Sequence, residues 1–281
     1  MKKLFSIILI VLLGVGLNTG CKKDKGDPPD LPPLGTMIID FSNFDSQKKS
    51  VESIDDIKGV ENSNWEFAAL VAGYWKTLIN VTLAVPVATF VLATQNNPAF
   101  VEENVWQWSY NTSVTVNQVS VIYKARLVGQ IRETDILWKM NISKEGTGAF
   151  GEFVWFEGTS KPDGTGGQWI LNHSSQFPEV VLQIDWSKSG NSVSAVKYSY
   201  VRTLNNTRQP DPFKGSFIEY GNTNAALNSF YNIHYYNGIE FSDVRVEWNS
   251  SSREGRARSV SYFGNNNWYC WNSNLVNIVC P

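Results

Sequence analysis

Histidine and cysteine are scarce in this sequence, with two and three residues respectively among 281. His173 and His234 lie far apart, and no Gly-x-Ser-x-Gly segment occurs, so nothing favours a Ser-His-Asp hydrolase. Neither histidine has the spacing to a cysteine that a zinc site needs. We therefore expect no metal ion and no cofactor, and the sequence names no catalytic residue.

Charged side chains are also few, at 18% of the chain, and the formal net charge is −2. The basic residues are scattered and form no stripe that could neutralise a run of phosphates, so we expect no nucleic-acid partner. No repeat of fixed period is present, which counts against a propeller or a solenoid.

Glycosidase chemistry needs only two facing carboxylates, so these absences do not exclude it. The adjacent pairs Asp55-Asp56 and Glu102-Glu103 would point their side chains in different directions on a strand, and we place them in solvated loops. Asp163 opens a glycine cluster, where an Asp-Gly turn explains the residues better than a calcium or phosphate site does. A hydrolase acting on glycans stays open as an alternative, without named residues.

The first residues have the form of a secretory signal peptide. Lys2 and Lys3 precede the apolar run Leu4–Leu17, which is too short for a lasting membrane span, and small residues lead to Gly20 and Cys21. We therefore expect residues 1–20 to be removed on export.

The junction Leu17-Asn18-Thr19-Gly20-Cys21 resembles the lipobox of bacterial lipoproteins, although Asn18 stands where that family usually has leucine. The resemblance implies acylation of the Cys21 sulfur and anchoring of the chain in a membrane, since each buried CH₂ contributes about 0.8 kcal/mol.

The residues that follow are similar to the start of many lipoproteins of the Bacteroidetes, and the similarity does not extend into the folded domain. Lys22 directly after the cysteine favours, by analogy, the outer membrane, with either the periplasmic or the surface-exposed leaflet possible. Residues 21–35 contain a proline-rich stretch, and we interpret them as a semi-rigid tether. Residues 36–281 then form one β-rich domain.

One long apolar stretch, Phe67–Ala93, has 20 apolar residues among 27 and a single charge, Lys76. Ser63 and Glu66 have the capping-box spacing of a helix start, which predicts a helix at about residues 64–93. Pro86 lacks an amide hydrogen and should kink this helix. A membrane span is conceivable by length, but Lys76 and the proline favour a helix buried in the protein core.

Nearly everything after this helix alternates between apolar and polar residues, as in Val244, Val246 and Trp248 against Arg245 and Glu247. This period of two, with frequent turn residues between segments, predicts an antiparallel meander of about a dozen strands. A first strand is expected at residues 36–42. The strands would form a curved sheet, a half-open barrel or a closed barrel around the kinked helix; a two-sheet sandwich with the helix on one face is the alternative.

Two further features concern side chains. Cys270 and Cys280 are predicted to form a disulfide, because exported chains meet an oxidising compartment. Tryptophan is abundant, and its rings serve either to fill the core or to stack on sugars, core filling being the simpler explanation. The strand tryptophans are Trp106, Trp108, Trp138, Trp155, Trp169, Trp186 and Trp248.

The sequence thus predicts a lipid-anchored envelope lipoprotein that is not obviously an enzyme. The leading hypothesis is that the protein is a non-catalytic binding module, either for an apolar ligand inside the sheet or for a glycan on its outer face. A structural or assembly subunit that docks onto another envelope protein is the first alternative, and the glycan hydrolase is the second. The ligand-binding residues are unknown at this level.

Replacing Cys21 tests the anchor. The variant Cys21→Ser cannot carry acyl chains, so we expect it to move from the membrane to the soluble fraction and to lose the mass of the lipid. Fractionation and intact-mass measurement check this. A variant with unchanged partitioning and mass would contradict the predicted anchor.

Overall fold

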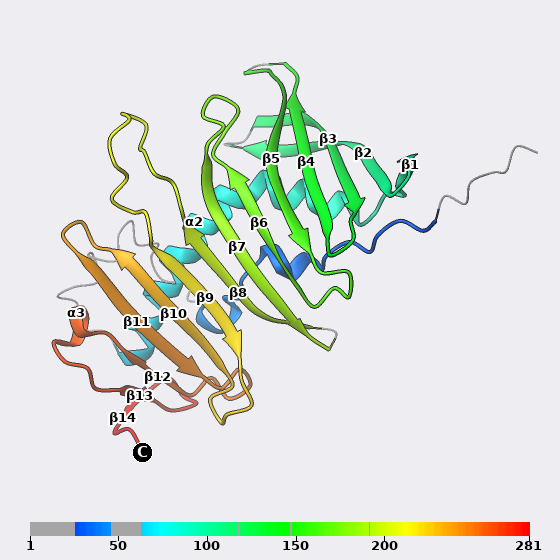
Figure 1. Ribbon diagram of the computed structural model, residues 1–281. Coiled ribbons are helices and arrows are strands. Elements are labelled where there is room, and N and C mark those ends of the chain that lie inside the picture. Colours follow the sequence, from blue (N-terminus) through cyan, green and yellow to red (C-terminus); the bar gives the residue numbers. More distant parts are fainter. Residues whose placement is uncertain (1–25, 46–62, 117–118, 147, 191) are drawn as a thin grey trace, which may run out of the picture.

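The computed structural model describes residues 26–45, 63–116, 119–146, 148–190 and 192–281 (Figure 1). One antiparallel sheet of fourteen strands dominates the fold, and each strand pairs with its neighbour in sequence. The strands are β1 Ala99–Glu102, β2 Val105–Val116, β3 Val119–Ile131, β4 Ile136–Lys144, β5 Phe150–Ser160, β6 Gly166–Asn172, β7 Val180–Ser189, β8 Ser192–Tyr200, β9 Phe217–Asn222, β10 Ser229–Tyr236, β11 Phe241–Trp248, β12 Gly255–Arg258, β13 Tyr269–Trp271 and β14 Asn277–Ile278.

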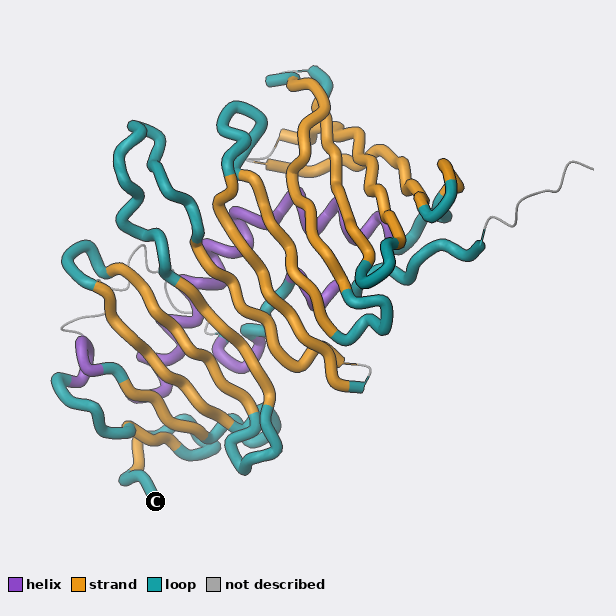
Figure 2. Tube along the Cα trace, viewed as in Figure 1, coloured by secondary structure: helices purple, strands orange, loops and turns teal. Residues whose placement is uncertain are grey.

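The sheet is open. β1 and β14 lie at its two ends, so the meander confirms the mainly antiparallel β prediction but not a closed barrel (Figure 2). The sandwich alternative is also wrong, because all fourteen strands belong to one sheet, and β8 pairs directly with β9 although a long connection separates them in sequence. Strand pairing needs only one continuous set of hydrogen bonds, and local alternation of residues cannot reveal whether that set closes on itself.

Helix α2, Asn64–Ala93, runs along one face of the sheet, which we call the inner face (Figures 1 and 2). Its capping box is present: the amide of Glu66 donates to the Ser63 hydroxyl, and the Glu66 carboxylate accepts from the Ser63 amide. The axes of Asn64–Asn80 and Thr82–Ala93 differ by 63°. The bend lies one turn before Pro86, whose ring and missing amide hydrogen weaken the helix at that point.

The two arms of α2 pack near opposite ends of the sheet. The first arm begins at β13, where the Asn64 side chain donates to the Cys270 carbonyl oxygen at 2.9 Å. The second arm packs over β5 and β6, where Phe90 meets Phe156 and Trp169 edge to face. Because α2 crosses so many strands, its apolar residues are buried over most of its length.

The segment before α2 also lies on the inner face. The short 3₁₀ turns η1, Leu34–Met37, and η2, Ser42–Phe44, flank residues of extended backbone that pair with no strand, so the predicted first strand is wrong. Met37, Ile39 and Phe41 are nevertheless buried alternately. Burial alternates in this segment because one side of the extended backbone packs on the core and the other side faces solvent. Of the predicted tether, Pro29 and Pro32 are buried as well.

Tryptophan rings of the inner face lie over glycines of the neighbouring strand. Trp169 stands directly opposite Gly158, and a Cβ atom on that glycine would come within 2.6 Å of the ring. The same arrangement, with a similar close approach, recurs at Gly129 and Trp138, at Gly167 and Trp186, and at Gly255 and Trp271. Each glycine leaves a gap in the pleated surface, and the facing ring fills it.

The closeness of this packing yields a direct test at Gly158. The variant Gly158→Ala would place a Cβ 2.1 Å from the Gln168 carbonyl oxygen, so the strands would have to move apart. We expect a loss of about 2–4 kcal/mol in the free energy of unfolding. Chemical denaturation measures it.

The matched control is Gly151→Ala, in the same strand, where no atom lies within 4 Å of the added Cβ. Its stability should stay within about 0.5 kcal/mol of the parent value. Equal losses of stability in the two variants would show that replacing a glycine, and not the close contact with Gln168 and Trp169, causes the loss.

Candidate functional site

The residues singled out in the sequence lie in different places. Cys21 falls outside the described residues, as do Asp55 and Asp56. Cys270 and Cys280 form a disulfide, with Cα atoms 5.2 Å apart, which confirms the predicted pair. The bridge ties the last residues to β13, next to the point where α2 begins.

The remaining carboxylates singled out in the sequence do not form a catalytic pair. Glu102 and Glu103 are exposed at the turn between β1 and β2. Asp163 accepts hydrogen bonds from the amide and the hydroxyl of Thr165, which is an Asp-initiated turn, and these bonds lower the pKa of Asp163. Among the residues that the structure describes, no group of three or more His, Cys, Asp or Glu side chains could hold a metal ion.

The strand tryptophans mainly fill the core, as the simpler explanation predicts. Six of the seven are buried, and Trp155 is half-buried within a cluster of Tyr123, Phe150 and Phe153. They therefore do not provide an exposed platform for sugars.

A cavity of about 220 Å³ lies between α2 and the inner face of the sheet, beside the helix bend; we call it the inner cavity. Side chains of α2 form one wall, and β7, β8, β10 and the connection between β8 and β9 form the other. The lining residues are Tyr74, Trp75, Leu78, Ile79, Thr82, Val181, Leu182, Tyr198, Tyr200, Phe213, Ser216, Tyr235 and Tyr236. None of them carries a charge. Leu78 and Phe213 are 43% and 47% exposed, so they mark the entrance.

Two buried donors of the inner cavity have no hydrogen-bond partner within the described part of the chain: the Tyr198 hydroxyl and the Trp75 indole NH. Other polar groups of the lining are paired. Tyr200 donates to the Asp211 carboxylate at 2.8 Å, and Thr82 donates to the Leu78 carbonyl oxygen at 2.8 Å. A buried donor without a partner costs about 1–3 kcal/mol, so an acceptor oxygen that reached either of these donors would be stabilised.

Both tyrosine hydroxyls of β8 stay protonated over the ordinary pH range. Burial raises the pKa of Tyr198 far above its usual value. Burial, together with the hydrogen bond to Asp211, raises the pKa of Tyr200 to about 12. The lining of the inner cavity therefore stays uncharged, and its affinity for a neutral ligand should not depend on pH near neutrality.

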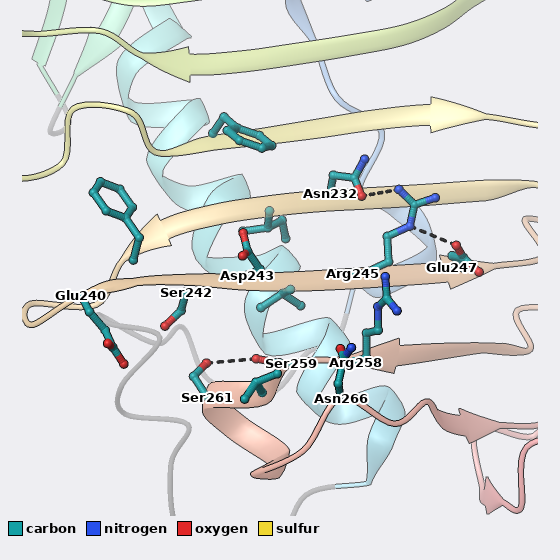
Figure 3. Close-up of a pocket in the computed structure, with 15 residues that line it drawn as sticks. Asn232, Glu240, Ser242, Asp243, Arg245, Glu247, Arg258, Ser259, Ser261 and Asn266 are labelled. Atoms are coloured by element: carbon teal, nitrogen blue, oxygen red, sulfur yellow. Dashed lines mark hydrogen bonds and ion pairs between the residues drawn. The ribbon is translucent and has the colours of Figure 1, made fainter.

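A second hollow, of about 830 Å³, lies on the opposite, outer face of the sheet over β9–β12 and helix α3, Val260–Phe263 (Figure 3); we call it the outer groove. One of its ends is aromatic: the His234 ring stacks on Phe241 at a centroid distance of 4.6 Å and on Phe217 at 5.6 Å. Asp243 holds this histidine through a 2.7 Å contact with Nδ1.

The other end of the outer groove is cationic. Arg245 and Arg258 stand directly opposite each other on β11 and β12, and Figure 3 shows both side chains rising on the same side. Arg245 bonds Glu247 at 3.0 Å, and Glu247 also accepts from Arg256 at 2.6 Å. Burial alone would raise the pKa of Glu247, but the two arginines hold that pKa below its ordinary value.

Sequence patterns placed these residues in elements of the correct type but did not identify either site. Trp75 and Ile79 lie in the predicted helix, and Tyr198 lies on a strand of the predicted meander. The aromatic end of the outer groove was missed, although His234 alternates with buried residues of β10 and so had to point outward. A signal was present, because β10 is rich in aromatic residues on both faces.

In comparisons with known proteins, no protein-family model, no curated protein and no solved structure matches the chain. Within the described ranges, no single helix is both long and apolar enough to cross a membrane, whereas the two arms of α2 together have the length and composition of a broken span.

Two tyrosines of β8 allow a matched test of the inner cavity. The variant Tyr198→Phe removes an unpaired donor, so the free energy of unfolding should stay equal or rise by about 1–3 kcal/mol. The variant Tyr200→Phe removes the hydroxyl from which the buried Asp211 carboxylate accepts a hydrogen bond. Its free energy of unfolding should fall by about 1.5 kcal/mol or more. Denaturation of ligand-free protein compares them. Equal losses would show that Tyr198 has a partner after all.

Proposed function

We propose that this chain is a lipid-anchored lipoprotein of the cell envelope whose β-rich domain binds a small apolar ligand in the inner cavity. The signal peptide and Cys21 support the anchor, and Lys22 after the cysteine favours the outer membrane. The observation that carries the binding role is the uncharged inner cavity with its two unpaired buried donors.

The volume of the inner cavity limits the ligand. An apolar cavity of about 150 Å³ is enough to hold a benzene-sized molecule, so about 220 Å³ accepts one ring or a short branched chain. A larger molecule can enter with one end only, and its remainder would pass Leu78 and Phe213 at the entrance.

The lining determines the chemistry of the bound end. A carboxylate or an ammonium group would lose its hydration without gaining an opposite charge, which is costly in an apolar site. A neutral carbonyl or ether oxygen instead accepts from Tyr198 or Trp75. The ligand class is therefore a neutral, largely apolar molecule with one or two acceptor oxygens, such as an ester, a ketone or a terpenoid alcohol.

A filled interior would have favoured the alternative role as a structural subunit. In a scaffold, the contact between helix and sheet should be packed throughout, since an empty volume costs stability without a gain. A cavity placed beside a helix bend, with an entrance to solvent, fits a binding module better.

Native mass spectrometry tests this function. The exported Cys21→Ser chain, which lacks the anchor, would be measured before and after extraction with organic solvent. We expect extra mass that extraction removes and that is identified as a neutral apolar molecule.

A filled cavity provides the control for the location. The variant Ile79→Phe adds volume at the cavity wall and should remove the extra mass, whereas Leu70→Phe, the same kind of change on a part of α2 outside the lining, should keep it. Retention of the ligand by Ile79→Phe, with intact folding, would place the ligand elsewhere. A bare parent chain that also fails to take up added apolar esters would refute the function.

A further inference from the structure

A second site, independent of the inner cavity, is indicated by the surroundings of one arginine of the outer groove, Arg258. Arg245 and Arg258 face each other across neighbouring strands, and like charges in this position repel. Arg245 is neutralised by Glu247. Arg258 has no ion pair among the described residues; its guanidinium group rests on the Trp268 ring at 4.7 Å. The lining holds three carboxylates, those of Glu240, Asp243 and Glu247, but in the described part of the chain none of them forms an ion pair with Arg258.

The same carboxylate cannot serve a third arginine. Glu247 already accepts from Arg245 through one oxygen and from Arg256 through the other. Asp243 contacts His234 at 2.7 Å and, among the described residues, forms no ion pair with an arginine. Glu240 lies at the far end of the outer groove from Arg258 in Figure 3. An anionic group from outside the chain would complete the pairing at Arg258.

The rest of the outer groove suits a sugar. Carboxamides and hydroxyls surround Arg258, with Asn232, Ser259, Ser261 and Asn266 in the lining. At the other end His234 stacks on Phe217 and Phe241, and the exposed ring of Phe241 provides an aromatic surface, whereas Lys197 lies over the Phe217 ring at 4.1 Å. Aromatic faces and planar amide or guanidinium groups together match the C–H faces, hydroxyls and carboxylate of an acidic sugar.

We infer that the outer groove binds an acidic glycan, with Arg258 bonding the carboxylate of a uronic acid residue and the Phe217–His234–Phe241 stack contacting a neighbouring sugar ring. The volume of about 830 Å³ is within the range of small-molecule sites, which supports two or three sugar residues. This site lies on the outer face of β9–β12 and shares no lining residue with the inner cavity, so the two proposals can be tested independently.

The test compares an oligomer of galacturonate with a galactose oligomer of the same length, by isothermal titration calorimetry on the exported Cys21→Ser chain. We expect the acidic oligomer to bind, and the neutral one to bind at least about tenfold more weakly. Arg258→Gln should weaken binding of the acidic oligomer by about tenfold or more without changing that of the neutral one. Arg258→Lys, which keeps the charge but not the planar fork, should lie between.

Two controls keep the result specific. Arg208→Gln removes the same charge from the exposed connection between β8 and β9, outside the groove, and should leave affinity unchanged. Thermal unfolding of each variant separates lost binding from lost folding. Equal loss in Arg208→Gln, or equal binding of inorganic polyphosphate and the acidic oligomer, would reduce the effect to general charge attraction and overturn the inference. Absence of binding to the acidic oligomer would overturn it as well.

Discussion

The contact between tryptophan rings and the glycines opposite them is the interaction on which the inner face depends. A ring that fills the gap above Gly158 or Gly167 can do so only in one register, because a shift by one residue would turn that tryptophan to the outer face. The four such pairs are spread from β3 to β13. They therefore fix the register of four of the thirteen strand pairings, in a sheet whose two ends do not pair with each other.

The tryptophan rings of the inner face also determine how α2 packs on the sheet. Phe90 packs edge to face on Trp169, whose own ring lies over Gly158 and whose NH donates to Thr36 at 3.1 Å. A single tryptophan thus connects a neighbouring strand, the helix and the segment before the helix. The inner cavity lies between α2 and the sheet, beside the helix bend.

The two faces of the sheet carry different chemistry because successive strand residues point in opposite directions. In β10, Tyr235 lines the inner cavity, whereas Asn232 lines the outer groove. One face is aromatic and uncharged, and the other combines arginines, amides and a ring stack. A single layer of strands therefore separates the two proposed sites, one for a neutral apolar ligand and the other for an acidic glycan.

Local patterns were sufficient for the parts of this protein that depend on neighbours in sequence. The capping box at Ser63 begins the helix, Pro86 weakens it one turn earlier, and alternation marks the strands, since each of these effects acts within a few residues. The cysteine pair was predictable for a different reason, because exported chains meet an oxidising compartment. Closure of the sheet, the inner cavity and the unpaired Arg258 were not predictable, because they depend on how distant segments meet. Only the tertiary structure brings Trp75 and Tyr198 to the same cavity. It also places Arg258 beside Arg245, whose partner Glu247 is already shared with Arg256.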